Sequence, residues 1–142
     1  MPVPALHTHQ SPLVLRDMDL IKKFEDIEVG ITITTDDEKI RAIFEPKAPT
    51  IEARIHALKT LRENNIKTYA FIGPALPMDP EALCKRIFPF VDNVLIDRMN
   101  YTSKTQNIYR HLKLQHWLDR DFANSIIERL KDCLSEKAEV VC

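Results

Sequence analysis

Apolar residues recur along the chain with two spacings, one typical of strands and one typical of helices. Residues Val29 to Thr35 form a β-branched run with one glycine, which suits a half-buried, pleated surface. Asp36 and Asp37 follow this run and can cap a short helix that extends to Phe44. Because the strand leads directly into a helix, the stretch predicts one βα unit.

The same succession of strand and helix recurs along the chain. Strands are predicted at 4–9, 29–35, 67–72 and 94–96, and helices at 17–24, 36–44, 50–64, 79–91, 103–118 and 122–134. Asp17, Thr50 and Asp79 are the expected N-caps of the first, third and fourth of these helices, and Asn64 with Asn65 can form the left-handed turn that ends the third. The helix at 103–118 has a poor apolar stripe, and 139–142 could form a last short strand. We therefore predict a single domain over 1–142, with four βα units in 1–100 and carboxyl-terminal helices plus a short strand in 101–142.

Repeated βα units predict an α/β fold with a parallel sheet and right-handed crossovers. Polar residues follow each predicted strand: His7 to Ser11, Thr34 with Thr35, Gly73 with Pro74, and Asp97 to Asn100. In parallel sheets these positions meet at one edge, so we expect them to converge on a ligand pocket. Two alternatives remain open. The threonines and aspartates could be ordinary strand and cap residues, and the sheet could be a complete open α/β domain or part of a barrel.

Composition narrows the class of protein. The chain has 142 residues, of which 44% are hydrophobic and 29% charged, as in globular domains. It is shorter than the roughly 250 residues of a closed eight-stranded barrel. A net charge of −1 excludes a globally basic nucleic-acid binder, and two glycines leave no glycine-rich phosphate loop. The sequence shows no apolar run that could span a membrane and no signal peptide, so the expected location is the cytoplasm.

The cysteines and histidines do not predict a metal site. Cys84, Cys133 and Cys142 are odd in number and have no C-x-x-C spacing, which argues against a disulfide framework and against a zinc site. We therefore predict reduced thiols. His7 and His9 lie two apart on a predicted strand and could face one metal, but no further ligand lies near them in sequence.

Residues 98–118 combine positive charge with aromatic rings. The segment contains Arg98, Lys104, Arg110 and Lys113 with no acidic residue, interleaved with Tyr101, Tyr109 and Trp117. Such a mixture can hold a nucleic-acid backbone and stack a base. The alternative is a solvated helix with its aromatic residues packed underneath.

Five segments in order resemble one enzyme family. They are SPLVLRDMDLI, VGITITT, the EPKAP that follows Phe44, IKTYAFIGPALP and VDNVLIDRMN. Together, from about Pro4 to about Tyr109, they resemble the spore-photoproduct-lyase-like branch of the radical S-adenosylmethionine superfamily. The resemblance implies a partial (β/α)6 barrel, a 4Fe-4S cluster held by C-x-x-x-C-x-x-C, and cleavage of S-adenosylmethionine to a 5′-deoxyadenosyl radical, with nucleic acid as one possible substrate.

The cluster motif is absent from these 142 residues, and the first strand resembles the family's third. The chain thus resembles the carboxyl-terminal half to two thirds of such a protein and is expected to be inactive alone. The three cysteines do not replace the motif, because cluster ligation needs several sulfurs brought together. Partners implied are a missing amino-terminal half, or a second copy paired across an open sheet edge.

The resemblance also assigns candidate cofactor contacts. The family's polar strand residue that faces S-adenosylmethionine falls on Thr32 or Thr34, and Gly73 with Pro74 matches the loop beside the adenosine. The family's Thr-Lys-Ser turn corresponds to His9, Gln10 and Ser11, so a neutral amide replaces the lysine. Two functional classes follow: part of a radical enzyme, or a non-catalytic α/β remnant that acts as an interaction module.

Overall fold

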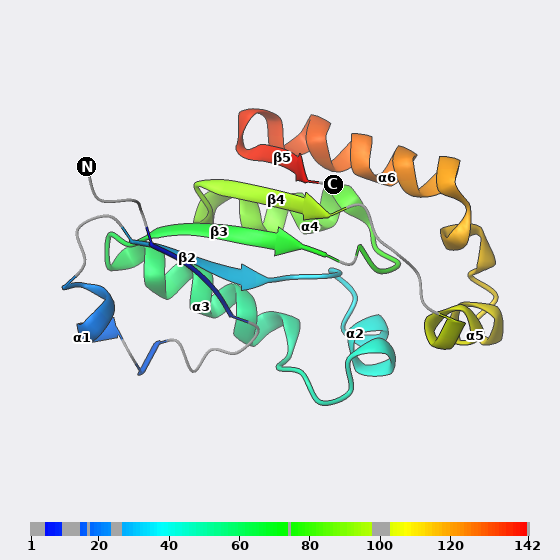
Figure 1. Cartoon of the computed structure of the whole chain (residues 1–142), viewed down its shortest axis with the longest axis horizontal. Coiled ribbons are helices and arrows are strands. Elements are labelled where there is room, and N and C mark those ends of the chain that lie inside the picture. Colours follow the sequence, from blue (N-terminus) through cyan, green and yellow to red (C-terminus); the bar gives the residue numbers. More distant parts are fainter. Residues whose placement is uncertain are drawn as a thin grey trace.

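The chain folds as an α/β domain built on one parallel sheet (Figure 1). The computed structural model describes residues 5–9, 15–16, 18–23, 27–73, 75–97 and 103–141; for 5–9, 103–105 and 140–141 the description is of the backbone alone. The strands are β1 (Ala5–His9), β2 (Ile27–Thr32), β3 (Lys67–Ile72), β4 (Asn93–Asp97) and β5 (Ala138–Val141). The helices are α1 (Met18–Ile21), α2 (Glu38–Phe44), α3 (Ile51–Glu63), α4 (Pro80–Ile87), α5 (Ser103–His111) and α6 (Arg120–Leu134), with 3-10 turns η2 (Phe88–Phe90), η3 (Gln115–Leu118) and η4 (Ser135–Lys137).

The strands lie in the sheet in the same order as in the sequence, β1-β2-β3-β4-β5, and every neighbouring pair is parallel. Right-handed crossovers that always advance in one direction place their helices on one face of the sheet. Figure 1 shows α3 and α4 behind the strands on that face, and α6 packs against α4 and β5. The predicted parallel α/β class is confirmed, and the predicted last short strand is β5.

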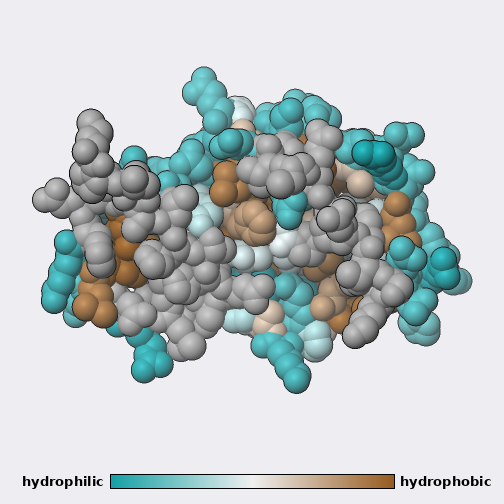
Figure 2. Space-filling model, in the orientation of Figure 1, coloured by the Kyte–Doolittle hydropathy of each residue, from teal (hydrophilic) through white to brown (hydrophobic). Residues whose placement is uncertain are grey.

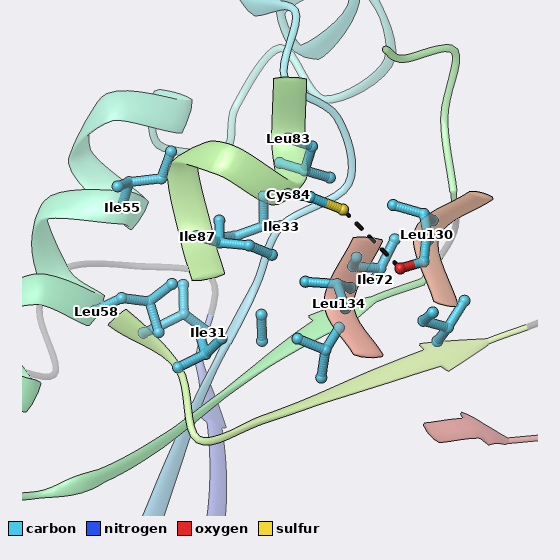
Figure 3. Close-up of a cluster of buried hydrophobic side chains, with 14 of the residues drawn as sticks. Ile31, Ile33, Ile55, Leu58, Ile72, Leu83, Cys84, Ile87, Leu130 and Leu134 are labelled. Atoms are coloured by element: carbon cyan, nitrogen blue, oxygen red, sulfur yellow. Dashed lines mark hydrogen bonds between the residues drawn. The ribbon is translucent and has the colours of Figure 1, made fainter. Parts of the chain in front are cut away.

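Side chains on the helix-covered face form the core (Figure 3). Ile31, Ile33 and Ile72 project from or beside the strands and are fully buried. They meet apolar side chains of three helices, namely Ile55 and Leu58 of α3, Leu83 and Ile87 of α4, and Leu130 and Leu134 of α6. Each such side chain contributes roughly 1.5 to 3 kcal/mol by leaving water. Because strand side chains alternate between the two faces, the two-residue period of apolar residues determines which side chains the helices cover.

The opposite face of the sheet carries the alternate residues of the same strands. Gly30 of β2 lies under Tyr69 of β3, and a Cβ added at Gly30 would stand 2.1 Å from a carbon of that ring. Any larger side chain at position 30 would require the Tyr69 ring to move. Figure 2 views the molecule from this side and shows apolar and weakly polar residues near the centre, between residues drawn in grey, with hydrophilic side chains at the rim.

Local capping chemistry explains where the helices begin. Asp37 accepts hydrogen bonds from the backbone of Lys39 and Ile40, Thr50 accepts one from Ala53, and Asp79 accepts one from Ala82. These three caps were predicted from the sequence. Asp36, predicted as a second cap for α2, instead accepts a hydrogen bond from the Asp79 backbone N–H at 2.8 Å. The expected cap at residue 17 lies outside the described residues.

Two sequence predictions were wrong in this part of the chain. The single helix expected over 103–118 ends at His111, because Lys113 takes a left-handed conformation with φ of 59°, and a separate 3-10 turn follows. Cys84 and Cys133, expected to be reduced thiols, are joined by a disulfide with a Cα–Cα distance of 6.3 Å. A separation of 49 residues in sequence gave no sign that α4 and α6 pack side by side.

A bidentate ion pair also crosses the α4–α6 interface. Arg129 donates from Nε to Glu81 Oε1 at 3.0 Å and from Nη2 to Glu81 Oε2 at 2.6 Å. This hydrogen bonding lowers the pKa of Glu81 below its ordinary value. Both side chains are about half exposed, so we expect the pair to add little to stability beside the disulfide.

We predict that removing the disulfide destabilises the domain. The double variant Cys84→Ala/Cys133→Ala should lose about 2 to 4 kcal/mol of unfolding free energy, because its unfolded state regains the entropy of a long closed loop. Chemical denaturation of the variant, and of the wild type with and without a reducing agent, measures this loss. Cys142→Ser is the control and should leave stability unchanged. Equal stability of the double variant and the wild type contradicts the prediction.

Candidate functional site

The carboxyl ends of three adjacent strands place polar or small residues at one level. Thr32 is the register partner of Phe71, and Ile72 is the partner of Ile96. Following the register further along each strand brings Thr34, Gly73 and Asp97 side by side across β2, β3 and β4. This edge is where ligands bind in parallel α/β folds. The structure thus brings together three of the polar strand exits singled out in the sequence.

Gly73 allows close packing at the centre of this edge. A Cβ added to Gly73 would lie 2.7 Å from a ring carbon of Phe71 and 2.8 Å from the Cβ of Asp97, closer than real Cβ contacts. The Phe71 ring and the Asp97 side chain therefore stand on the same face of the sheet as the missing side chain. A residue larger than glycine would displace both.

The segment that leaves β2 is held by its own hydroxyl groups. Thr34 Oγ1 donates to Glu45 Oε1 at 2.7 Å, and Thr35 Oγ1 donates to the Pro77 carbonyl at 2.7 Å. The Leu76 backbone N–H donates to the Thr34 carbonyl at 3.0 Å. Both threonines are fully buried. Their hydroxyl protons are therefore already donated within the protein, and their first role in this structure is to fix the loops.

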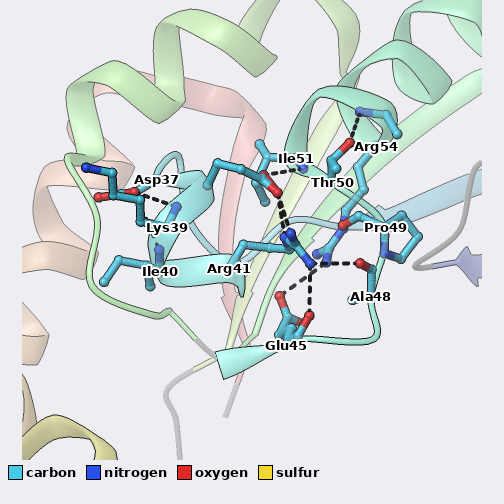
Figure 4. A network of polar contacts seen from close by, with 12 residues as sticks. Asp37, Lys39, Ile40, Arg41, Glu45, Ala48, Pro49, Thr50, Ile51 and Arg54 are labelled. Atoms are coloured by element: carbon cyan, nitrogen blue, oxygen red, sulfur yellow. Dashed lines mark hydrogen bonds and ion pairs between the residues drawn. The ribbon is translucent and has the colours of Figure 1, made fainter. Parts of the chain in front are cut away.

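A buried arginine organises the same region (Figure 4). Arg54 of α3 is completely buried, and its three nitrogens donate to different partners. Nε donates to the Pro49 carbonyl at 3.1 Å, Nη1 to the Thr32 carbonyl at 3.2 Å, and Nη2 to Glu45 Oε1 at 3.2 Å. One side chain thereby joins the end of β2, the turn before α3 and the carboxylate that receives the Thr34 proton.

A second arginine closes the turn that follows α2. Arg41 donates through Nη1 to the carbonyls of Glu45 at 3.1 Å and Ala48 at 2.9 Å, and through Nε to Glu38 at 2.7 Å. Glu38 also accepts the Ile51 backbone N–H at 3.1 Å, at the start of α3. Both guanidinium groups at the β2 exit are thus paired within the protein.

Thr32 differs from the two threonines that follow it. Its side chain is 5% exposed, and among the described residues its hydroxyl makes no hydrogen bond. Asp97 is partly exposed and, within the described part of the chain, likewise makes no hydrogen bond or ion pair. The resemblance assigned the ligand contact to Thr32 or Thr34. The two hydroxyl groups differ in the structure, because the Thr34 hydroxyl donates its proton to Glu45.

Other predicted site residues cannot be placed. Gln10, Ser11 and Pro74 lie outside the described residues, and β1 is described at His7 and His9 by its backbone alone. Sequence reasoning did not single out Phe71, Glu45 or Arg54 as site residues. Arg54 carried a usable signal, since it is a charged residue three positions after Ile51, inside the apolar stripe of its helix.

The site residues present here do not form a place for an iron-sulfur cluster. In the described ranges, no group of three or more histidine, cysteine or acidic side chains is arranged to hold a metal. Cys84 is in a disulfide, and its sulfur lies in the core, 4.0 Å from the Leu130 carbonyl oxygen (Figure 3). These side chains therefore do not fit the thiolate ligation that such a cluster needs.

Two aromatic residues of the basic segment are part of the protein interior. Tyr109 is fully buried, with its ring centroid 4.9 Å from that of Phe44. Trp117 is 7% exposed and stacks edge-on against Phe122, with centroids 4.9 Å apart. Neither ring is free to stack on a base. For these two rings, the reading as aromatic residues packed beneath a solvated surface is confirmed; Tyr101 lies outside the described residues.

Comparison with known proteins shows similarity to proteins of undescribed function. The chain is 40% identical over 118 residues to an uncharacterized protein of Methanocaldococcus jannaschii, covering 82% of this chain and 43% of that protein. It is 33% identical over 69 residues to an uncharacterized protein of Acidianus two-tailed virus, covering 48% of this chain and 23% of that protein. No family model matches the chain. The chain spans less than half the length of these curated relatives.

Among the residues described, no helix combines the length and the apolar character needed to traverse a bilayer.

We predict that the Arg54–Glu45 pair determines the stability of the carboxyl edge. Arg54→Met should lower the unfolding free energy by about 3 to 5 kcal/mol, because it leaves the Glu45 carboxylate largely buried without its cation. Arg54→Met/Glu45→Gln should recover part of that loss. Denaturant titration measures both. Arg110→Met, at an exposed position, is the control. An Arg54→Met protein as stable as the control contradicts the prediction.

Proposed function

We propose that this chain is part of a radical-S-adenosylmethionine-type barrel and supplies one wall of its adenosyl site. The observation that carries the proposal is the unreversed strand order with its crossover helices on one face. Doubly wound open sheets reverse their strand order and carry helices on both faces, whereas barrels do not. The polar edge formed by Thr34, Gly73 and Asp97, with Thr32 two residues before it, lies at the carboxyl ends of the strands, as a barrel ligand site requires.

The rest of such a barrel would come from polypeptide outside these 142 residues. The matched relatives are more than twice as long as the region they share with this chain. The outer edge of β1 pairs with no other described strand. We propose that this edge pairs with a strand from a preceding segment, which would also carry the cluster ligands. S-adenosylmethionine would then be held between the two parts.

A second candidate function rests on a different observation. The sequence contains no C-x-x-x-C-x-x-C, and the described cysteines form a disulfide instead of a ligand set. A protein that consisted of this chain alone would therefore be a non-catalytic α/β module that acts by association. The family resemblance implies a possible nucleic-acid substrate only for the first candidate function, the radical enzyme.

We predict that the chain alone does not acquire a cluster. Anaerobic reconstitution with iron and sulfide should leave it colourless after desalting, because it lacks the thiolates that bind the cluster. A longer protein in which a segment carrying C-x-x-x-C-x-x-C precedes this chain should gain broad visible absorbance under the same conditions. It should also form 5′-deoxyadenosine from S-adenosylmethionine when reduced. Colour retained by the chain alone, or no cluster in the longer protein, contradicts the proposal.

We predict further that the β1 edge drives association of the isolated chain. Unpaired backbone groups at a sheet edge are a template for another strand, so sedimentation at micromolar concentration should show dimers or larger species. Thr8→Lys places a charge on this edge strand and should shift the population toward monomer. His56→Lys adds the same charge on the exposed surface of α3 and should not. A wild-type monomer at these concentrations argues against the open edge.

A further inference from the structure

Helix α6 and strand β5 form one continuous unit at the end of the sheet. α6 leads through η4 into β5, and α6 packs against both α4 and β5. β5 pairs with β4 and, within the described sheet, with no other strand. Figure 1 shows this unit in orange and red beside β4. We call residues 120–141 the α6–β5 strap; beyond the η3 turn that precedes it, the strap is attached mainly to α4 and β4.

The disulfide between Cys84 and Cys133 ties the strap to α4. Cys84 of α4 is 3% exposed, and its sulfur lies against the Leu130 carbonyl of α6 (Figure 3). Cys133, in the last turn of α6, is partly exposed. Any opening that lifts α6 from α4 must separate the two cysteines, and the bond removes most of those open states. The disulfide therefore opposes opening of the strap and has no effect on local openings elsewhere, such as fraying of α2.

The backbone directly after the disulfide is held in an unusual conformation. Ser135 follows Cys133 by two residues and has φ of 53° and ψ of −129°, a region that residues other than glycine rarely adopt. The Ser135 N–H donates to the Lys131 carbonyl at the end of α6. Such a conformation costs free energy and persists only where its surroundings impose it. Its release on opening favours the open strap once the disulfide is cut.

Other contacts keep the strap closed most of the time without the disulfide. Leu130 and Leu134 of α6 are fully buried, and Arg129 pairs with Glu81 of α4. The reduced protein therefore has a closed strap in equilibrium with an open one. Opening uncovers the outer edge of β4 and the side of α4 that α6 covers. An unpaired strand edge is a surface on which another polypeptide strand can pair.

We propose that Cys84 and Cys133 form a redox-controlled latch on the α6–β5 strap. In the oxidised protein the latch holds the strap closed. In the reduced protein the strap opens as a unit while the rest of the sheet stays folded. This inference does not depend on the proposed function.

A dithiol supplies the two electrons for reduction. One thiolate of the dithiol attacks the sulfur of Cys133, which is the more exposed of the two, and Cys84 leaves as a thiolate that takes up a proton. The second thiolate of the dithiol then attacks its own sulfur in the mixed disulfide. This step releases the Cys133 thiol and leaves the dithiol as a cyclic disulfide. Oxidation by a disulfide of the same class reverses both steps.

Alkylation of Cys84 tests the latch in the full chain, with Cys142→Ser removing the third thiol. The protein is reduced with dithiothreitol, freed of it anaerobically and exposed to iodoacetamide, and mass spectrometry follows the peptide that contains Cys84. Because this thiol is buried beneath α6, it reacts only when the strap or the whole domain opens. Alkylation should be at least about tenfold faster than global unfolding allows, since partial openings cost less free energy. Its rate should also depend only weakly on denaturant.

A matched pair of variants separates strap opening from global unfolding. Glu81 is the second residue of α4 and pairs with Arg129 of the strap, whereas Glu52 is the second residue of α3 and pairs with Arg86 of α4. Glu81→Gln should speed alkylation of Cys84 by about two- to fivefold, as expected for loss of an exposed ion pair. Glu52→Gln should leave the rate unchanged. Denaturant titration should show that both variants are folded.

Hydrogen exchange compares the two redox states of the same protein. On reduction, amides of α6 and β5 should exchange roughly 30- to 1,000-fold faster, and those of α2 should not change. Reoxidation should restore slow exchange.

Three results overturn the inference. They are alkylation of Cys84 no faster than global unfolding allows, equal responses to Glu81→Gln and Glu52→Gln, and unchanged exchange in α6 after reduction. None of them bears on the proposed function, which depends on cluster uptake and S-adenosylmethionine cleavage in the longer protein.

Discussion

A fully buried guanidinium must find acceptors inside the protein, and this constraint organises the carboxyl edge of the sheet. Arg54 satisfies it with the Thr32 carbonyl, the Pro49 carbonyl and the Glu45 carboxylate. These three partners belong to a strand, a turn and the residue that ends α2. Each guanidinium nitrogen of Arg54 donates in a fixed direction. Movement of the loop would therefore leave the buried charge of Arg54 without its acceptors. The protein's own side chains therefore hold the β2 exit in place.

The same network fixes the two hydroxyl groups that follow β2. The Thr34 hydroxyl donates to Glu45, and the Thr35 hydroxyl donates to the Pro77 carbonyl in the segment after β3. On the opposite face, the described side chains outside this network include Thr32, the Phe71 ring and, beside Gly73, the Asp97 carboxylate. The proposed site would be pre-organised, since its residues sit on strands and its supporting bonds are made by neighbouring loops.

Helices cover only one face of the sheet, because the crossovers advance in one direction. The face under α3, α4 and α6 supplies the core, and the disulfide between Cys84 and Cys133 fastens α4 to α6 there. The other face supplies the polar edge. A sheet with crossovers on both faces would have buried Thr32 and Phe71 beneath a helix. One-sided coverage is also what the proposed barrel requires of this sheet.

The sequence by itself determined the local elements and the class of fold. Strand and helix periods, the caps Asp37, Thr50 and Asp79, and the turn at Asn65 with φ of 62° depend on residues close in the chain, and each was predicted. The convergence of Thr34, Gly73 and Asp97 also followed, since the carboxyl ends of parallel strands share one edge.

Only the tertiary structure decided which of those hydroxyl groups are paired within the described part of the chain. Whether Thr32 or Thr34 keeps its hydroxyl depends on Glu45, which lies 11 residues beyond Thr34, and on Arg54 from another helix. The pairing of Cys84 with Cys133 and the burial of Tyr109 likewise depend on how distant helices pack. Periodicity carries no information about such contacts, because it reports the face of an element and not what comes to lie against it.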